Sequence, residues 1–81
     1  MKAQEIKAKM EKLKPDEKTL SNIQAVSRTG SITLFTAYIE NNVYFLAAGI
    51  ITSVNQQHKI VKRSCDWGMI VNHILYITNH N

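Results

Sequence analysis

The residues best suited to chemistry lie in the basic segment HKIVKR, residues 58–63, and that chemistry is contact with phosphate. Lysine and arginine side chains bind nucleic-acid phosphates through their charge and their N–H groups. The segment has a strand-like pattern, so the alternation of side chains would place its cations on two faces. Phosphate contact and simple solvation of these cations are therefore both consistent with the sequence.

Groups that could catalyse a reaction or bind a metal do not form a recognised pattern. The candidates His58, Cys65, Asp66, His73 and His80 show none of the spacings typical of zinc sites. Cys65 lies beside an acid rather than in a cationic setting, so we expect an unreactive thiol. Four of the six carboxylates fall in the first 20 residues, and the three glycines are scattered. We therefore expect no enzymatic activity, no catalytic residue, no metal and no cofactor.

The composition indicates one globular domain that spans residues 1–81. The chain is 44% hydrophobic and 20% charged, with a formal net charge of +4, which is typical of a folded protein. A single cysteine excludes an intrachain disulfide and favours a reducing compartment, so we expect a cytoplasmic protein. The charged N-terminus lacks the apolar core of a secretory signal. The longest apolar run, Val43–Ile51, is too short to cross a membrane, so we expect no membrane association.

One or two helices are expected in residues 1–30. An apolar stripe at helical spacing predicts a short amphipathic helix; it is formed by Ile6, Met10 and Leu13. Pro15 interrupts this helix and is well placed to begin a second one, which would end before Gly30. Ser21 and Gln24 match a capping box, so the second helix could instead begin at Ser21.

From Ser31 onwards the pattern changes to that of short strands separated by polar turns. The turn at residues 40–42 contains two asparagines, which tolerate the left-handed backbone of tight hairpins. Further turns are expected at residues 55–57 and 65–68. The expected strands are Ile32–Ile39, Val43–Val54, His58–Ser64, Met69–Asn72 and Ile74–Thr78.

Gly49 lies inside the second expected strand, where it predicts a sharp bend. A long strand bent at glycine is typical of very small barrels. The sequence therefore predicts an α+β fold, in which an N-terminal helix or helix pair precedes a strongly bent antiparallel β-barrel of about five strands. The helical segment would cover residues 1–30 and the barrel residues 31–78.

The spacing around this bend resembles the first motif of Sm-like (SH3-like) barrels. Gly49 is followed six residues later by Asn55, and Lys59 precedes the apolar pair at residues 60–61. The segment at residues 69–77 resembles the second Sm motif. Within it, Asn72-His73 resembles the Lys-His pair of bacterial Hfq. A helix that precedes such a barrel is similar to the YolD-like family of low-GC Gram-positive bacteria and their phages.

This resemblance implies a non-enzymatic module that binds RNA or single-stranded DNA. Hfq-like rings bind uridine-rich RNA through turn residues and the Lys-His pair, which correspond here to Asn55, Gln56, Asn72 and His73. Asn and Gln amides can contact base edges, and a histidine can stack on a base. Together with the basic segment, the candidate nucleic-acid-binding residues are Gln56, His58, Lys59, Lys62, Arg63, Asn72 and His73.

The alternative is a small protein-interaction module, such as a phage- or plasmid-encoded regulator or inhibitor of a host enzyme. The modest net charge and the uncharged strand at residues 31–39 favour this reading. So does Gln57, which stands where Hfq has an aromatic residue. For either function, an unpaired apolar strand at Ile74–Thr78 predicts a homo-oligomer formed by edge pairing.

Overall fold

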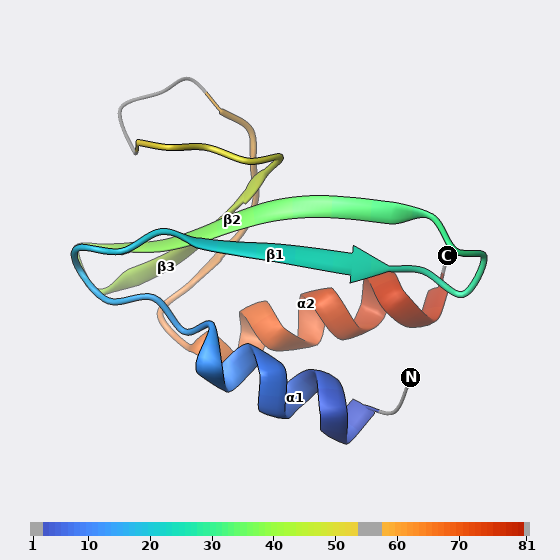
Figure 1. Ribbon diagram of the computed structural model, residues 1–81. Helices are drawn as coiled ribbons and strands as arrows, with labels where there is room; N and C mark the ends of the chain where they lie inside the picture. The colour runs from blue at the N-terminus through green and yellow to red at the C-terminus, as the bar shows by residue number, and fades with distance from the viewer. Residues whose placement is uncertain (1–2, 54–57, 81) are drawn as a thin grey trace.

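The computed structural model describes residues 3–53 and 58–80 and shows an α+β fold (Figure 1). Its elements are α1 (Ala3–Lys12), β1 (Ser21–Val26), β2 (Ile32–Glu40), β3 (Val43–Ala48), β4 (Ile60–Ser64) and α2 (Trp67–His80). The four strands form one antiparallel sheet in the order β1-β2-β3-β4, so β1 and β4 are its edges. Both helices lie on the same side of this sheet (Figure 1). Neither helix in the described residues is long and apolar enough to span a bilayer.

The hairpin between β2 and β3 forms where the sequence predicts it. Glu40 pairs with Val43, and the two residues between them, Asn41 and Asn42, have φ angles of 54° and 65°. Two consecutive left-handed residues are typical of the tight turn that matches the twist of paired strands. The predicted turn at residues 40–42 is therefore confirmed.

Gly49 bends the chain away from the end of β3. Its φ angle is +81°, and its amide still donates a hydrogen bond of 2.8 Å to the carbonyl of Leu34 in β2. The predicted bend at Gly49 is confirmed, but the strand ends at Ala48 instead of continuing to Val54. Residues 49–53 then pass over the face of the sheet opposite the helices (Figure 1).

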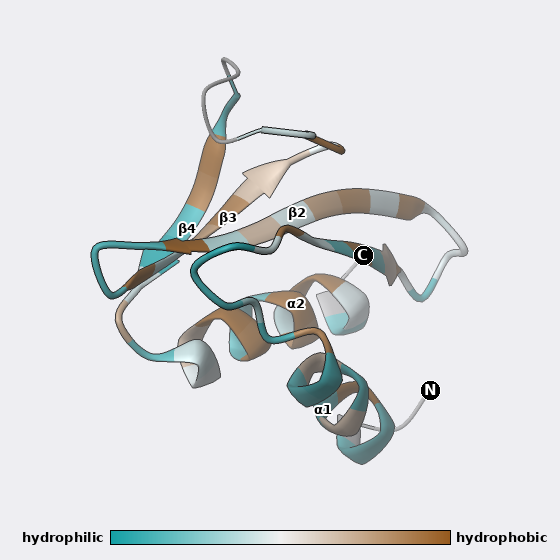
Figure 2. Cartoon of the chain, turned by 60° about the vertical axis from the view of Figure 1, so that its left-hand side comes forward, coloured by the Kyte–Doolittle hydropathy of each residue, from teal (hydrophilic) through white to brown (hydrophobic). Residues whose placement is uncertain are grey.

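The main core lies between the sheet and the two helices. It contains Ile6, Met10, Ile23, Ala25, Phe35, Ala37, Leu46, Trp67, Ile70, Val71 and Ile74. Figure 2 shows α2 as largely apolar and α1 as largely hydrophilic, so α2 contributes more to this core. The indole N–H of Trp67 donates a hydrogen bond of 3.1 Å to the carbonyl of Met10 and fixes one helix to the other.

A smaller cluster on the other face holds residues 49–53 against the sheet. It is formed by Tyr38, Ala47 and Ile51, with Leu20, Phe45 and Ile60 packed around them. The hydroxyl of Thr36 accepts a hydrogen bond from the amide of Ile51 and donates one to the carbonyl of Gly49, both at 3.0 Å. Thr36 is fully buried, and its hydroxyl binds the residues on both sides of Ile50.

The predicted second helix between Pro15 and Gly30 is wrong, because residues 21–26 form β1. Ile23 and Ala25 are buried, whereas Asn22 and Gln24 are exposed. This alternation has the period of two that a strand on a covered face requires.

The predicted strands Met69–Asn72 and Ile74–Thr78 are also wrong, because these residues belong to α2. The buried residues Trp67, Ile70, Val71 and Ile74 have the spacing of one helix face. Asp66 caps this helix, since its Oδ1 accepts a hydrogen bond of 2.9 Å from the amide of Gly68. The described residues therefore form an open four-stranded sheet rather than a five-stranded barrel, and the edge expected at Ile74–Thr78 is absent from it.

Candidate nucleic-acid interface

Three cations lie along the edge of the sheet at β4, and we call Lys59, Lys62 and Arg63 the basic edge. Lys59 directly precedes the strand, and its carbonyl accepts a hydrogen bond of 2.8 Å from the amide of Ala48. Within residues 3–53 and 58–80, β4 pairs with β3 alone, and the β3 sequence VYFLAA contains no charged residue. No cross-strand carboxylate therefore neutralises the basic edge.

The register of β3 and β4 separates the cations of the basic edge, as their alternation predicts. Lys62 pairs with Leu46, whose side chain belongs to the core under the helices, and Arg63 pairs with Phe45 on the opposite face. The register shifts between Leu46 and Ala47. The cations of the basic edge therefore border both faces of the sheet.

On the helix side, the structure brings Lys62 close to His73 of α2. Helix α2 packs against β4, and the imidazole of His73 is half-buried. Burial lowers the pKa of His73 below its ordinary value, and the positive charge of Lys62 lowers it further. The lowered pKa favours the neutral imidazole, in which one ring nitrogen can accept a hydrogen bond and the other can donate one. Asn72 precedes it on α2 and is exposed.

On the opposite side, His58 takes part in an aromatic cluster. Its Nε2 lies 3.0 Å from the hydroxyl of Tyr38, and its ring meets the Tyr38 ring edge-on at 5.7 Å between centroids. Tyr38 stacks on Phe45 with ring centroids 5.2 Å apart. Since Phe45 is the cross-strand partner of Arg63, this cluster places a half-buried aromatic face next to a cation.

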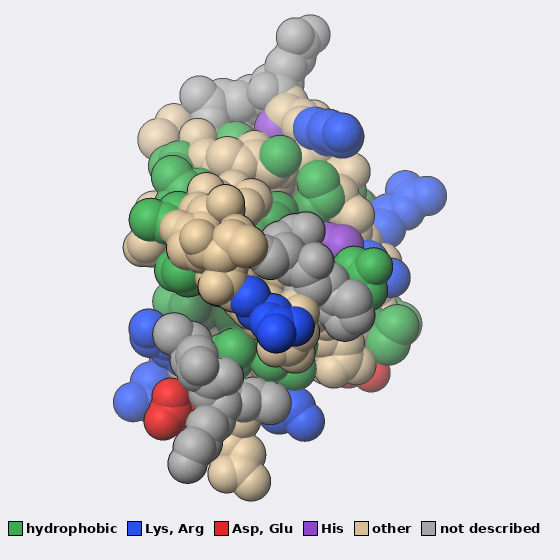
Figure 3. Space-filling model, turned by 90° about the vertical axis from the view of Figure 1, so that its right-hand side faces the viewer, with side chains coloured by type: hydrophobic (Ala, Val, Ile, Leu, Met, Phe, Trp, Pro, Cys, Tyr) green, Lys and Arg blue, Asp and Glu red, His purple; other side chains and the backbone are tan. Residues whose placement is uncertain are grey.

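A shallow hollow lies at the surface beside β4. It is lined by Phe45, Ile60, Val61, Lys62 and Arg63. A hollow whose lining combines an aromatic ring with two cations is suited to a nucleobase and its phosphate. Elsewhere the positive charge is spread out: Figure 3 shows Lys and Arg side chains at several separate places on one face, with fewer acidic groups.

The predicted site residues thus fall into two groups on the two sides of β4. Lys62, Asn72 and His73 lie towards α2, while His58 and Arg63 lie towards the aromatic cluster. Gln56 falls outside the described residues, as do Asn55 and Gln57. Lys59 is exposed beside the start of β4.

Two residues of the candidate interface, Tyr38 and Phe45, were not predicted from the sequence. The pairing of Phe45 with Arg63 depends on the register of β3 with β4, which no local pattern reveals.

Other chemistry has little support in the described parts of the chain. Residues 3–53 and 58–80 hold no group of three or more His, Cys, Asp or Glu side chains that could bind a metal. Cys65 is an exposed free thiol in the turn before α2.

The chain was compared with models of protein families, with curated proteins and with solved structures, and none of them matches it.

Proposed function

We propose that the chain is a non-catalytic module that binds single-stranded RNA or DNA along the basic edge. The observation that carries this proposal is the position of Lys62 and Arg63 on an edge strand, and of Lys59 directly before it, beside a strand that has no charge. Cations that are not engaged by carboxylates can neutralise phosphates and release their counterions. An edge strand also leaves one side open along its length, so a flexible nucleic-acid strand can approach it.

The charge of the surrounding sequence agrees with this proposal. Residues 58–80 contain one carboxylate, Asp66, against the three cations of the basic edge. The Oδ1 of Asp66 accepts the amide hydrogen of Gly68 at the start of α2. Because this carboxylate is engaged in capping the helix, we expect it to compete only weakly with phosphate for the basic edge.

The interface offers different roles to its residues. Lys62 and Arg63 would contact phosphates on the two sides of β4, and Phe45 would stack on a base. Asn72 and His73 would contact base edges from α2. His58 would act indirectly, because its bond to the hydroxyl of Tyr38 holds the ring on which Phe45 stacks. This proposal requires neither a barrel nor a ring with a central pore.

The test is a titration of labelled oligo-U, oligo-A and a duplex at several salt concentrations. Replacing Lys62 and Arg63 together by Gln should weaken binding to each single strand and reduce the slope of log K against log salt by about 1.4. The matched control replaces Lys7 and Lys18 by Gln, which changes the net charge equally but leaves the basic edge intact. Affinity no tighter than about 100 µM at low salt would reject the proposal.

A second variant tests the stacking role of Phe45. Phe45→Leu keeps an apolar side chain at this position but removes the aromatic face. We expect it to weaken single-strand binding by about 1–3 kcal/mol and to leave the salt slope unchanged. An unchanged affinity would remove Phe45 from the interface without affecting the role of the cations.

A protein-interaction module is the second candidate, and a different surface favours it. At the far end of the β1–β2 hairpin, Val26 and Ile32 form a cross-strand pair with exposed fractions of 39% and 59%, and Leu34 is 44% exposed. Val26 belongs to the edge strand β1, and Ile32 and Leu34 belong to the neighbouring strand β2, so this surface lies away from the basic edge. Binding of a protein here would resist salt. Replacing Ile32 and Leu34 by Ser should abolish such binding and leave oligonucleotide binding unchanged.

A further inference from the structure

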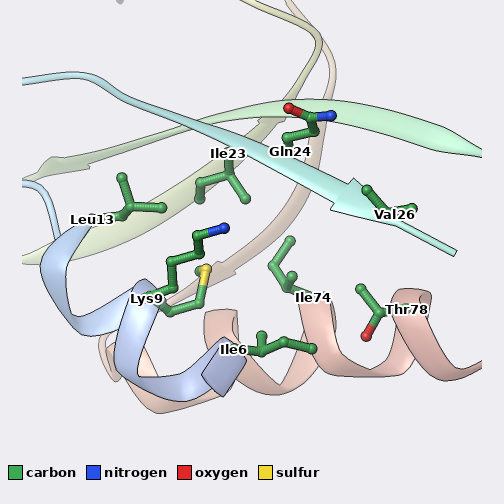
Figure 4. Close-up of a pocket in the computed structure, with 9 residues that line it drawn as sticks. Ile6, Lys9, Leu13, Ile23, Gln24, Val26, Ile74 and Thr78 are labelled. Atoms are coloured by element: carbon green, nitrogen blue, oxygen red, sulfur yellow. The ribbon is translucent and has the colours of Figure 1, made fainter. Parts of the chain in front are cut away.

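A small apolar cavity lies on the helix side of the sheet, beneath the edge strand β1. Helix α1 packs against α2, and a space of about 190 Å³ stays open between α1, β1 and α2. Its walls include Ile6, Met10, Leu13, Ile23 and Ile74. Figure 4 shows these walls converging from a strand and two helices that are far apart in the sequence.

The polar groups of this cavity are few, and one of them carries a charge. Lys9, Gln24 and Thr78 also line it. In Figure 4 the side chain of Lys9 extends from α1 towards β1, so that its nitrogen lies between the helix and the strand. The hydroxyl of Thr78 donates to the carbonyl of Leu75 at 2.9 Å, which leaves its oxygen as an acceptor. The residues that line the cavity include no Asp or Glu.

We propose that this cavity binds a short aliphatic carboxylate, with its chain among the isoleucines and its carboxylate on Lys9. A dry cavity of about 150 Å³ with apolar walls can hold benzene, so this larger space fits a chain of about six to eight carbons. A carboxylate near the opening would form a charge-assisted hydrogen bond with the Lys9 ammonium.

The charge of Lys9 distinguishes this ligand from a purely apolar one. A neutral chain would gain only from burial of its methylene groups, whereas a carboxylate would also pair with the cation. Glu5 lies one helical turn before Lys9 and could pair with it in the free protein. A bound carboxylate would take over this pairing from a position nearer the apolar walls.

The NMR signals of the isoleucine methyl groups provide a direct test of this binding. Octanoate is titrated into the protein while the methyl signals are followed by NMR. Saturable shifts are expected at Ile6, Ile23 and Ile74, which line the cavity, and not at Ile32 and Ile50, which are exposed outside it. Octanamide has the same chain without the charge, so it should bind more weakly.

Two variants test whether the charge of Lys9 binds the carboxylate. Lys9→Gln should weaken octanoate binding about tenfold and leave octanamide binding unchanged. Lys12→Gln makes the same change of charge at an exposed residue of α1 that does not line the cavity, and it should have no effect. Equal binding of octanoate and octanamide, shifts that do not saturate, or shifts as large at Ile32 and Ile50 would overturn the proposal.

A peptide is the competing occupant, since the outer edge of β1 could pair with an extended chain. A short peptide that ends in Leu with a free carboxylate is therefore titrated in parallel. If it binds more tightly than octanoate and shifts the backbone amides of β1, the cavity is a peptide site and the proposal fails. The octanoate and peptide titrations are independent of the basic edge, because β4 is the opposite edge of the sheet from β1.

Discussion

The hydroxyl of Tyr38 and the Nε2 of His58 lie 3.0 Å apart, and this contact joins the middle of the sheet to the residues that lead into β4. Burial raises the pKa of the Tyr38 phenol, and the nearby carboxylate of Glu40 raises it further. The phenol therefore keeps its proton at neutral pH and can donate it to an unprotonated Nε2. In this way a buried tyrosine helps to position the start of the basic edge.

Tyr38→Phe should lower the free energy of unfolding by about 0.5–1.5 kcal/mol, because the variant removes one hydrogen bond from a buried side chain. Urea denaturation measures this change. Tyr44→Phe on the neighbouring strand is the matched control, since it also removes a phenol hydroxyl but leaves the contact between Tyr38 and His58 intact. Equal effects of the two variants would show that the bond to His58 contributes nothing to stability.

Thr36→Val should destabilise the fold by about 1–3 kcal/mol, although the two side chains have the same shape. The variant leaves the buried amide of Ile51 without its acceptor and the carbonyl of Gly49 without its donor. Thr33→Val on the same strand replaces an exposed threonine and should change stability little. If both variants unfold at the same urea concentration as the original protein, Thr36 does not hold residues 49–51.

Gly49→Ala should destabilise by about 1–2 kcal/mol through backbone strain alone. A Cβ atom at this position would meet nothing within 4 Å, but the φ angle of +81° disfavours any residue with a side chain. Asn tolerates the left-handed region better than Ala, so Gly49→Asn should recover part of the loss. Equal stability of the original and Ala variants would contradict the positive φ angle.

His73 should make the fold less stable in mild acid. Its folded-state pKa lies below the ordinary value of about 6.5, because of burial and then of Lys62. As the pH falls through 6.5, the unfolded chain binds a proton before the folded protein does, so stability decreases. Once the pH is below the folded-state pKa of His73, protonation of this residue lowers the stability no further.

The measurement for His73 compares urea midpoints between pH 8 and pH 5. His73→Gln removes the titrating group, so its midpoint should fall less over this range than that of the original protein. Parallel curves for the two proteins would argue against a lowered pKa. Replacing Lys62 by Gln should move the pKa of His73 upwards, which NMR titration of the ring protons would detect.

Local patterns predicted the elements whose structure depends mainly on nearby residues. The stripe that includes Ile6 and Met10 marks α1, and both side chains are buried. Asn41, Asn42 and Gly49 have the positive φ angles that their residue types favour. In each case the preference of the backbone agrees with the final fold.

The elements that were predicted wrongly have ambiguous local patterns. Leu20, Ile23 and Val26 fit a helix face, yet Ile23 and Ala25 are the buried pair, with the spacing of a strand. In α2 the many β-branched residues favour a strand, but packing under the sheet selects the helix. The capping residue Asp66, followed by Trp67 and Ile70, was the signal that could have identified this helix.

The candidate site could be predicted only as a set of residue types. The sequence places His73 ten or more residues from the basic segment, and only a helix at residues 67–80 that packs on β4 brings it close to Lys62. The pairing of Phe45 with Arg63 likewise depends on long-range strand register.

The hydrogen bond between Trp67 and Met10 has a consequence for synthesis of the chain on the ribosome. The partners of Ile6 and Met10 in the core include Trp67, Ile70 and Ile74, which are translated after all four strands. While the earlier segments emerge, the sheet can pair its strands, but its inner face has no α2 to cover it. Completion of the core must therefore await the emergence of α2 from the exit tunnel, and until then the nascent chain exposes an apolar surface that chaperones can bind.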